Sequence, residues 1–430
     1  MNSERFYFEE SFEKKDAKIL DKNIKCDFLI IGGGITGLSI AYFLSKKRKN
    51  VVVVDKGYIG EYASGRSSGF LTQNTELDLY QIENKYGAKE AKNLWNSLKE
   101  GINLIKDIIK EDKIDCNYEI QPSLYLAIKP SHIKILEKEN IVREKLSSKS
   151  NLIPKKELKN YIGSNAFYGG LLSKEDYSIN AFKYISGLRN YLLRKNVKIY
   201  EYTEALKINK NIVKTKYAEI EAKQIILSVD HFAKSLGYFK NEIISLKTFV
   251  GITERLPHDL VDDLFRKGKM LLWDTKKEYN YWRLLPDNRI LIGGGSDLEI
   301  VDNSKEETYE LKPYEDLYKD LIYFYPKLKN INFEYVYHGV MGMTLDFLPI
   351  VGKINNKDKL SFCLCSAGLP LSTFSAKYLV DKLLNNRKDF DKFFNPNREF
   401  SKVIYLESLF GEKIFDYFSG LYLKLLNRFR

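Results

Sequence analysis

The sequence predicts an α/β fold with an α+β second domain, and three observations lead to this prediction. The chain has 430 residues, which suits two domains but is long for one simple core. Residues 28–54 read as a strand, a helix and a second strand, and both strands are wholly apolar, as in a parallel sheet covered on both faces. Residues 249–292 instead carry alternating, aromatic-rich runs typical of an antiparallel sheet. We therefore expect a Rossmann-like domain joined to a second domain built on a mainly antiparallel sheet.

The expected elements alternate between these two parts along the chain. A strand at 28–31, a helix at 35–47 and a strand at 51–54 come first, and residues 81–150 are then largely helical around a strand at 123–128. Later elements are a helix at 181–194, strands at 197–202, 206–208, 225–228, 249–253, 270–273, 279–285, 290–292 and 362–365, and a helix at 375–384. The economical division is a discontinuous first domain of residues 1–80, 151–240 and 335–400, a second domain of residues 81–150 and 241–334, and an amphipathic helical tail at 401–430.

Composition narrows the classes of protein that the chain can represent. Hydrophobic residues make up 44% and charged residues 29%, which is an ordinary globular composition rather than a disordered one. The net charge of +12 indicates either an anionic partner, such as nucleic acid, a membrane surface or a phosphate-bearing ligand, or a general enrichment in Lys, since the basic residues form no single block. Four cysteines in a chain of this length argue against a disulfide framework and predict a cytoplasmic protein.

Two local patterns resemble a metal site and a membrane-spanning helix, but the surrounding residues support neither. Cys363-x-Cys365 has the look of half a metal site, but no second cysteine pair or histidine cluster accompanies it, so we expect a strand and no metal. Residues 28–45 are uncharged over a length that could span a membrane, yet three consecutive glycines near the start would each cost a helix about 1 kcal/mol. Residues 1–25 lack the apolar core of a signal peptide. We expect neither a spanning segment nor a secretion signal.

The segment Gly32–Gly37 matches G-x-G-x-x-G directly after a strand and at the start of a helix. Gly32 permits the tight turn, Gly34 lets the backbone approach a pyrophosphate, and Gly37 lets the helix pack closely on the sheet. Asp55 ends the next strand, where its carboxylate can accept hydrogen bonds from ribose hydroxyls and disfavours a 2′-phosphate. The setting predicts dinucleotide binding, against the alternative of a glycine turn used only for packing.

Further segments resemble one flavoprotein family. Residues 62–69, Tyr-Ala-Ser-Gly-Arg-Ser-Ser-Gly, resemble the A-S-x-R-(N/S)-x-G segment of the D-amino-acid oxidase-like (DAO) FAD-dependent oxidoreductases. Residues 176–180, 281–294 and 338–352 resemble three later family segments in the right order, D-x-x-x-(N/D)-P, Y-x-R…P-D-G-R-x-x-x-G-G and W-x-G-x-x-x-x-T-x-D-x-x-P-x-x-G. The layout of the chain is most similar to the gamma-glutamylputrescine oxidase, glycine oxidase and sarcosine oxidase branches.

The resemblance implies an enzyme that oxidises the C–N bond of an amine or amino acid. Hydride would pass to FAD held between the FAD-binding domain and the substrate domain, the imine product would hydrolyse, and oxygen or a quinone would accept the electrons. Non-covalent FAD is expected, because Met341 stands where some relatives have a flavin-linked cysteine and residues 63–69 contain no histidine. The implied FAD contacts are Gly32, Gly34, Ile35, Thr36, Gly37, Asp55, Lys56, Ser64, Arg66, Ser67, Ser68, Gly69, Leu206, Gly339, Met341, Gly368, Leu369, Pro370 and Leu371.

Three residues are candidates for the catalytic or substrate-binding role. Arg283 offers a planar fork for a carboxylate and Tyr281 a hydroxyl donor, unless both are structural and Arg283 pairs with Asp274. His338 either lines the flavin or is packed in the core. Lys247 is a weaker candidate, for activating oxygen as a lysine does in some relatives.

The C-terminal region departs from the family pattern. Leu369 and Pro370 replace the histidine and glycine of a G-x-S-G-H-G-like turn, and proline removes an N–H donor, which favours as one alternative a flavin-binding protein with a decayed active site. The apolar and basic tail at 405–430 reads either as a helix packed on the enzyme or as a peripheral contact with the inner face of the membrane. A second alternative is flavin-dependent tRNA modification, although the main reading involves a small-molecule substrate and no nucleic acid.

Overall fold

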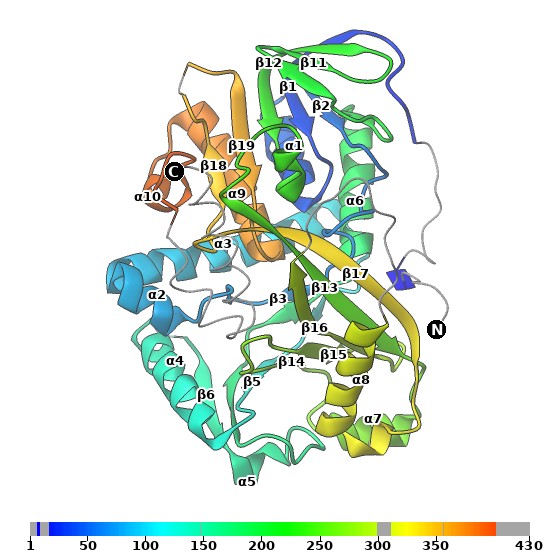
Figure 1. The fold of residues 1–430 in the computed structure, drawn as a ribbon, viewed down its shortest axis with the longest axis vertical. Coiled ribbons are helices and arrows are strands. Elements are labelled where there is room, and N and C mark those ends of the chain that lie inside the picture. Colours follow the sequence, from blue (N-terminus) through cyan, green and yellow to red (C-terminus); the bar gives the residue numbers. More distant parts are fainter. Residues whose placement is uncertain (1–6, 9–16, 147, 299–310, 356, 401–430) are drawn as a thin grey trace, which may run out of the picture.

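Two large sheets and one small sheet organise the part of the chain that the computed structural model describes, namely residues 7–8, 17–146, 148–298, 311–355 and 357–400 (Figure 1). The predicted tail helix at 401–430 lies outside these residues. None of the described helices is long and apolar enough to cross a membrane.

The first large sheet has a parallel centre, as the apolar strands predict. Five strands run parallel in the order β9-β2-β1-β12-β19. Their bounds are Lys198–Tyr200 for β9, Val51–Val54 for β2, Ile24–Ile31 for β1, Glu219–Leu227 for β12 and Leu360–Leu364 for β19. The antiparallel strands β10 (Lys207–Asn209), β11 (Ile212–Lys214) and β18 (Ile350–Gly352) extend it. Strand β1 begins four residues before the predicted start, because its first half is only partly buried and lacks the apolar run used to find it.

Helices cover this sheet and share its core. Helix α1 packs on α6 and α9, and the long helix α3 also packs on α9. The bounds are Ile35–Lys46 for α1, Leu79–Tyr86 for α2, Ala88–Asp112 for α3, Ala181–Arg194 for α6, Leu369–Asn385 for α9 and Asp391–Phe394 for α10. Gly101 sets the spacing of α3 and α9, since a Cβ there would lie 2.0 Å from the carbonyl oxygen of Pro370. The start of α9 is therefore held against α3 by close backbone contact.

The second large sheet is mainly antiparallel, as predicted, in the order β17-β13-β16-β15-β14-β5-β7-β6, with one parallel pair, β14 and β5. Its strands are β17 (Phe333–Thr344), β13 (Ile243–Thr253), β16 (Ile290–Leu298), β15 (Tyr281–Leu284), β14 (Leu271–Asp274), β5 (Ser123–Leu126), β7 (Gly169–Ser173) and β6 (Ser150–Pro154). The long strands β13 and β17 run diagonally through Figure 1 from this sheet toward the first. Around the sheet lie α4 (Ile133–Lys145), α5 (Lys155–Leu158), α7 (His258–Leu264) and α8 (Lys312–Phe324). The small third sheet joins β3 (Phe70–Leu71), β8 (Tyr177–Ser178) and β4 (Glu119–Ile120).

Some segments belong to a different sheet or core from the one that the sequence predicts. Strands β6, β7 and β17 pair within the second sheet, although residues 151–240 and 335–400 were assigned to the first domain. Helix α3, assigned to the second domain, packs in the core of the first. The apolar pattern of β17 is interrupted by Gly339 and Gly342, which is why no strand was expected there. The division into domains remains a prediction.

Helix α9 begins at Leu369, six residues before the predicted start at Ser375. The sequence predicts Pro370 to be part of a turn. In the structure Pro370 occupies the first turn of α9, where a backbone N–H has no intrahelical partner and proline is well tolerated.

Candidate functional site

A cavity of about 940 Å³ lies where the carboxyl ends of the parallel strands meet the second sheet. Residues that follow β1, β2, β12 and β19 line it, together with residues of β14, β15 and β17. In open α/β sheets this end of the parallel strands is where ligands bind. The cavity therefore joins the two parts of the molecule at the expected place.

The glycine turn forms one end of this cavity. Gly32 has a φ of +102°, and a Cβ on it would lie 2.5 Å from the carbonyl oxygen of Ser228, so a side chain is excluded. A Cβ on Gly37 would lie 1.9 Å from the carbonyl oxygen of Gly32, which shows how closely α1 packs on the turn. Gly34 faces Ser64, whose Oγ accepts a hydrogen bond from the N–H of Ile35 at 3.1 Å. The other N–H groups of this first helical turn lack intrahelical partners, which suits a phosphate.

Asp55 stands at the end of β2, on the cavity wall. Its Oδ2 accepts from the N–H of Gly33 at 2.6 Å and its Oδ1 from the N–H of Gly57 at 2.9 Å. Burial nevertheless raises the pKa of this carboxyl to about 6, against the two hydrogen bonds. The neighbouring Lys56 places its Nζ 3.4 Å from the ring centre of Phe232. The carboxylate keeps lone pairs that can accept ribose hydroxyls, so this edge fits the dinucleotide that the sequence predicts.

The segment at 62–69 lies beside the turn, and Ser64, Arg66, Ser67 and Ser68 line the cavity. Arg66 donates from Nε to the carbonyl oxygen of Glu61 at 2.9 Å and from Nη1 to that of His338 at 2.8 Å. It thereby ties the segment to β17. Gly69 is not part of the wall, and its Cβ would lie 1.9 Å from the carbonyl oxygen of Ile179, so it serves packing.

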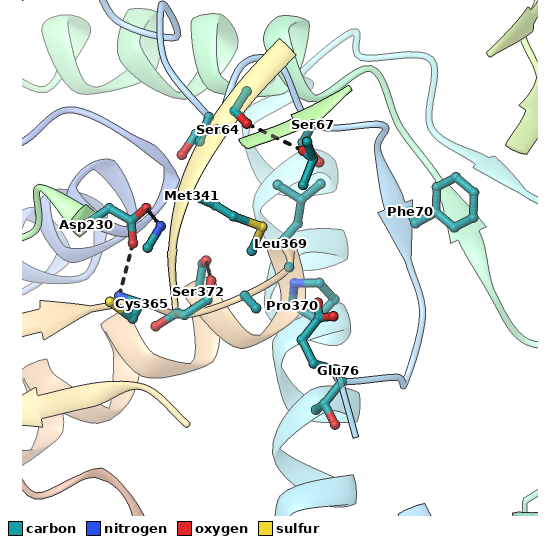
Figure 2. Close-up of a pocket in the computed structure, with 18 of the residues that line it drawn as sticks. Ser64, Ser67, Phe70, Glu76, Asp230, Met341, Cys365, Leu369, Pro370 and Ser372 are labelled. Atoms are coloured by element: carbon teal, nitrogen blue, oxygen red, sulfur yellow. Dashed lines mark hydrogen bonds between the residues drawn. The ribbon is translucent and has the colours of Figure 1, made fainter. Parts of the chain in front are cut away.

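Asp230 organises the opposite wall and is not among the site residues predicted from the sequence. Its two carboxylate oxygens accept from the N–H of Gly342 at 2.6 Å and from that of Cys365 at 3.2 Å, which joins β17 to the end of β19 (Figure 2). Asp230 itself has a φ of +53°. It follows β12 by three residues, so its place beyond the carboxyl end of a parallel strand was the signal that could have identified it.

The start of α9 closes this side of the cavity. Gly368, Leu369 and Pro370 line it, whereas Leu371 turns into the core. Figure 2 shows Met341, Leu369 and Pro370 around one hollow, with Ser64 and Ser67 above and Glu76 below. Leu369 and Pro370 are thus helical wall residues rather than members of a turn.

The predicted catalytic residues do not line the same cavity. Tyr281 lines the cavity, and Gly293 on the paired strand β16 makes room for it, because a Cβ there would lie 2.3 Å from the tyrosine ring. Arg283 lies outside this cavity, on a smaller one of about 320 Å³. Its Nη2 donates to the carbonyl oxygen of Ile179 at 2.9 Å, and burial lowers its pKa to about 10. Arg283 does not pair with Asp274, which accepts from the N–H of Lys276 at 2.7 Å.

Three other candidates also lie off the cavity wall. The side chain of His338 is buried on β17, and its carbonyl oxygen accepts from Arg66. Leu206 is 53% exposed, while the preceding Ala205 lines the cavity. Lys247 lies on β13 and is not part of the wall. For all three, contact with a cofactor, substrate or oxygen stays an untested prediction that this placement disfavours.

Residues in two of the segments that resemble the family form hydrogen bonds that hold the protein backbone in place. Asn180 caps α6 by accepting from the N–H of Lys183 at 3.0 Å, and Asp176 accepts from the hydroxyl of Ser123 at 2.5 Å. In the later segment, the carboxylate of Asp346 accepts hydrogen bonds from Nε and Nη2 of Arg398 at 2.8 and 2.9 Å. These motif residues fix the backbone around the cavity rather than entering it.

Comparison with known proteins decides the family. The family model described as "DAO: FAD dependent oxidoreductase" matches residues 27–382. The chain belongs to this family. It is 26% identical over 382 residues to "Gamma-glutamylputrescine oxidoreductase" of Escherichia coli (strain K12), across 87% of this chain and 88% of that protein.

Solved structures share the fold of this FAD-dependent oxidoreductase. Glycine oxidase from Geobacillus kaustophilus superposes with a TM-score of 0.73 at 19% identity, over 88% of this chain and 99% of that one. L-proline dehydrogenase from P. horikoshii gives a TM-score of 0.72 at 17% identity, over 86% of this chain and 97% of that one. The predicted fold class, family and cofactor are confirmed.

Proposed function

We propose that this FAD-dependent oxidoreductase oxidises a C–N bond of a small amine or amino acid, and that the imine product is released and hydrolysed in water. One observation supports this most directly: a single cavity runs from the glycine turn to a wall of the second sheet that carries Tyr281. The E. coli relative named for gamma-glutamylputrescine supports an amine-bearing substrate. Bound FAD would supply the hydride acceptor.

The residues of the chain would bind and orient the reactants. The first turn of α1 would hold the pyrophosphate, and Asp55 would accept the ribose hydroxyls. Tyr281, on the opposite wall, would contact the substrate, and the burial of the aromatic wall would exclude water. Oxygen or a quinone would then take up the electrons.

We also propose that the FAD is held without a covalent bond. Met341 cannot form a thioether link of the cysteine type. Cys363 and Cys365 line the cavity, but burial raises the pKa of both thiols and keeps them protonated and unreactive.

Purified protein tests this function directly. It should be yellow, and denaturation should release FAD into the supernatant. Anaerobic mixing with a panel of amines and amino acids should bleach the flavin with at least one compound, while free FAD in the same buffer stays oxidised. Protein that binds FAD and is bleached by dithionite but by no amine or amino acid would contradict the proposal.

A further inference from the structure

Glu76 places a carboxylate in the wall of the cavity, seven residues after Gly69, the last site residue predicted in that segment. It lies between β3 and α2, below Pro370 in the view of Figure 2. Its Oε2 accepts from the hydroxyl of Tyr279 at 3.3 Å, and none of the described residues forms an ion pair with it. Burial raises the pKa of this carboxyl. A half-buried carboxylate with one neutral hydrogen-bond partner leaves room for a cation that would stabilise its charged form.

Aromatic rings continue the surface around Glu76. The rings of Tyr279 and Tyr281 have centres 6.2 Å apart, and Phe70 packs edge-on against Tyr281 at 5.7 Å. All three residues line the same cavity as Glu76. Aromatic faces attract cations and repel anions, so they reinforce the preference of the carboxylate.

The acidic neighbours on this wall are already engaged. Asp78 caps α2 and accepts from its first turn, and Asp274 accepts from the N–H of Lys276. Glu139 pairs with Arg143 at 2.8 Å. Glu76 differs from these three because neither a backbone N–H nor a basic side chain of the described residues binds its carboxylate.

The two arginines of the wall do not offer a matching anion site. Arg66 is bound to two carbonyl oxygens, and Arg143 to Glu139 and Asn74. Arg283, the residue expected to bind a substrate carboxylate, lies outside the cavity. Lys129, Lys276 and Lys277 also line the cavity, and Lys276 pairs with Asp320 at 2.6 Å. Glu76 and the aromatic rings around it favour a cationic ligand at their own part of the wall.

We propose that Glu76, with Tyr279 and Tyr281, binds a protonated amine of the substrate, so that the enzyme prefers compounds with two amino groups. This inference rests on the proposed oxidation of a C–N bond. The reacting nitrogen would be a neutral amine, because its lone pair would form the imine C=N bond as the C–H bond of the adjacent carbon breaks and hydride leaves for FAD, so the ammonium that Glu76 binds is the second one. In this proposal Glu76 determines which substrate binds and takes no part in the hydride transfer.

Three probes with the same four-carbon chain test the inference on the full-length, FAD-loaded enzyme. They are 1,4-diaminobutane, 1-aminobutane and 4-aminobutanoate, which differ only at the far end, as ammonium, methyl and carboxylate. Dissociation constants are measured by anaerobic calorimetric titration, and FAD content by absorbance. We expect the diamine to bind at least about tenfold more tightly than 1-aminobutane, as a charge-assisted hydrogen bond allows, and 4-aminobutanoate to bind most weakly.

Substitutions then assign the preference to the residue. Glu76→Gln should weaken diamine binding by about tenfold and leave 1-aminobutane within about twofold, since only the charged contact is lost. Glu76→Asp keeps the charge and should keep the order of the three probes. Glu83→Gln is the matched control, because Glu83 lies on α2 outside the cavity and pairs with Lys145.

The wild-type comparison alone can overturn the inference. Three results would contradict it: the diamine does not bind detectably, the diamine and 1-aminobutane bind equally, or 4-aminobutanoate binds most tightly. A diamine preference that survives in Glu76→Gln would also contradict it. Bleaching of the flavin is recorded separately. A diamine preference without bleaching by any amine would support the cation site and contradict the proposed oxidation.

Discussion

Replacing Gly37 by alanine tests whether the packing of α1 on the glycine turn controls FAD binding. Gly37 lies in the helix itself and has no positive φ, so alanine is compatible with its backbone conformation. The obstacle is space: a Cβ would lie 1.9 Å from the carbonyl oxygen of Gly32 and 2.8 Å from Oγ of Ser228. Ordinary contact begins at 3.4 Å, so the start of α1 must move by about 1.5 Å relative to the turn.

The cost of this movement can be estimated from overpacking in other cores, which is about 1–3 kcal/mol. If the displaced helix must return to its position to bind the pyrophosphate, the cost appears in the affinity for FAD. A tenfold change corresponds to about 1.4 kcal/mol, so we expect FAD to bind roughly 5- to 150-fold more weakly. The higher helix propensity of alanine, about 1 kcal/mol, acts against the loss of stability and leaves affinity as the sensitive measurement.

The assay is a titration of the apoprotein with FAD, followed by quenching of flavin fluorescence, with unfolding in urea measured in parallel. Gly87→Ala serves as control. Gly87 has a φ of +86°, open space around it and no place on the cavity wall, so alanine there adds backbone strain without touching the turn. We expect it to lower stability and leave FAD affinity unchanged. Equal FAD affinity in Gly37→Ala and wild type would refute the argument.

Two further predictions concern charged groups. Lowering the pH from 7 to 5 should weaken FAD binding, because Asp55, with its pKa raised to about 6, becomes protonated and accepts the ribose hydroxyls less well; Asp55→Asn should lose this component of a fluorescence titration. A pKa raised by folding means that protonation of Asp55 favours the folded apoprotein as the pH falls through about 6, so a loss of affinity there is not explained by unfolding at this residue. Asp346→Asn should lower the free energy of unfolding in urea by about 3–5 kcal/mol, because the buried Arg398 loses its charged partner. Asp389→Asn, which breaks an exposed pair, should stay within about 1 kcal/mol, and equal effects of the two substitutions would show that burial of the pair is not what matters.

The cofactor end of the site could be read from the sequence because its chemistry is local. The turn, the helix start and the acid after the second strand lie within 24 residues, Gly32 to Asp55, and each has a backbone requirement that only certain residues meet. Structure adds the reason for each glycine: Gly32 is excluded from carrying a side chain by Ser228, and Gly37 by Gly32. Local spacing was sufficient here because one βαβ unit builds this end of the cavity.

The substrate end could not be read in this way, because distant segments build it. Glu76 follows β3, Tyr279 precedes β15, and their hydrogen bond joins residues 203 positions apart. No motif links them, since the contact depends on how β15 is placed in the second sheet. The prediction of Arg283 shows the converse limit: the residue type was suitable for a carboxylate, but strand β15 directs Tyr281 to the main cavity and Arg283 to the smaller one.

The replacement of histidine and glycine by Leu369 and Pro370 is better explained by helix position than by decay of the site. Read as a turn, the segment loses an N–H donor at Pro370. In the structure α9 already begins at Leu369, and the carbonyl oxygen of Pro370 packs against Gly101 of α3, so proline rigidifies the first turn where it faces the cavity. The remaining N–H groups of that turn keep the positive end of the helix directed at the wall that Leu369 and Pro370 form. The departure therefore changes which groups the cavity presents near α9, from polar to apolar, and the proposed selection of substrate charge rests with Glu76 rather than with this turn.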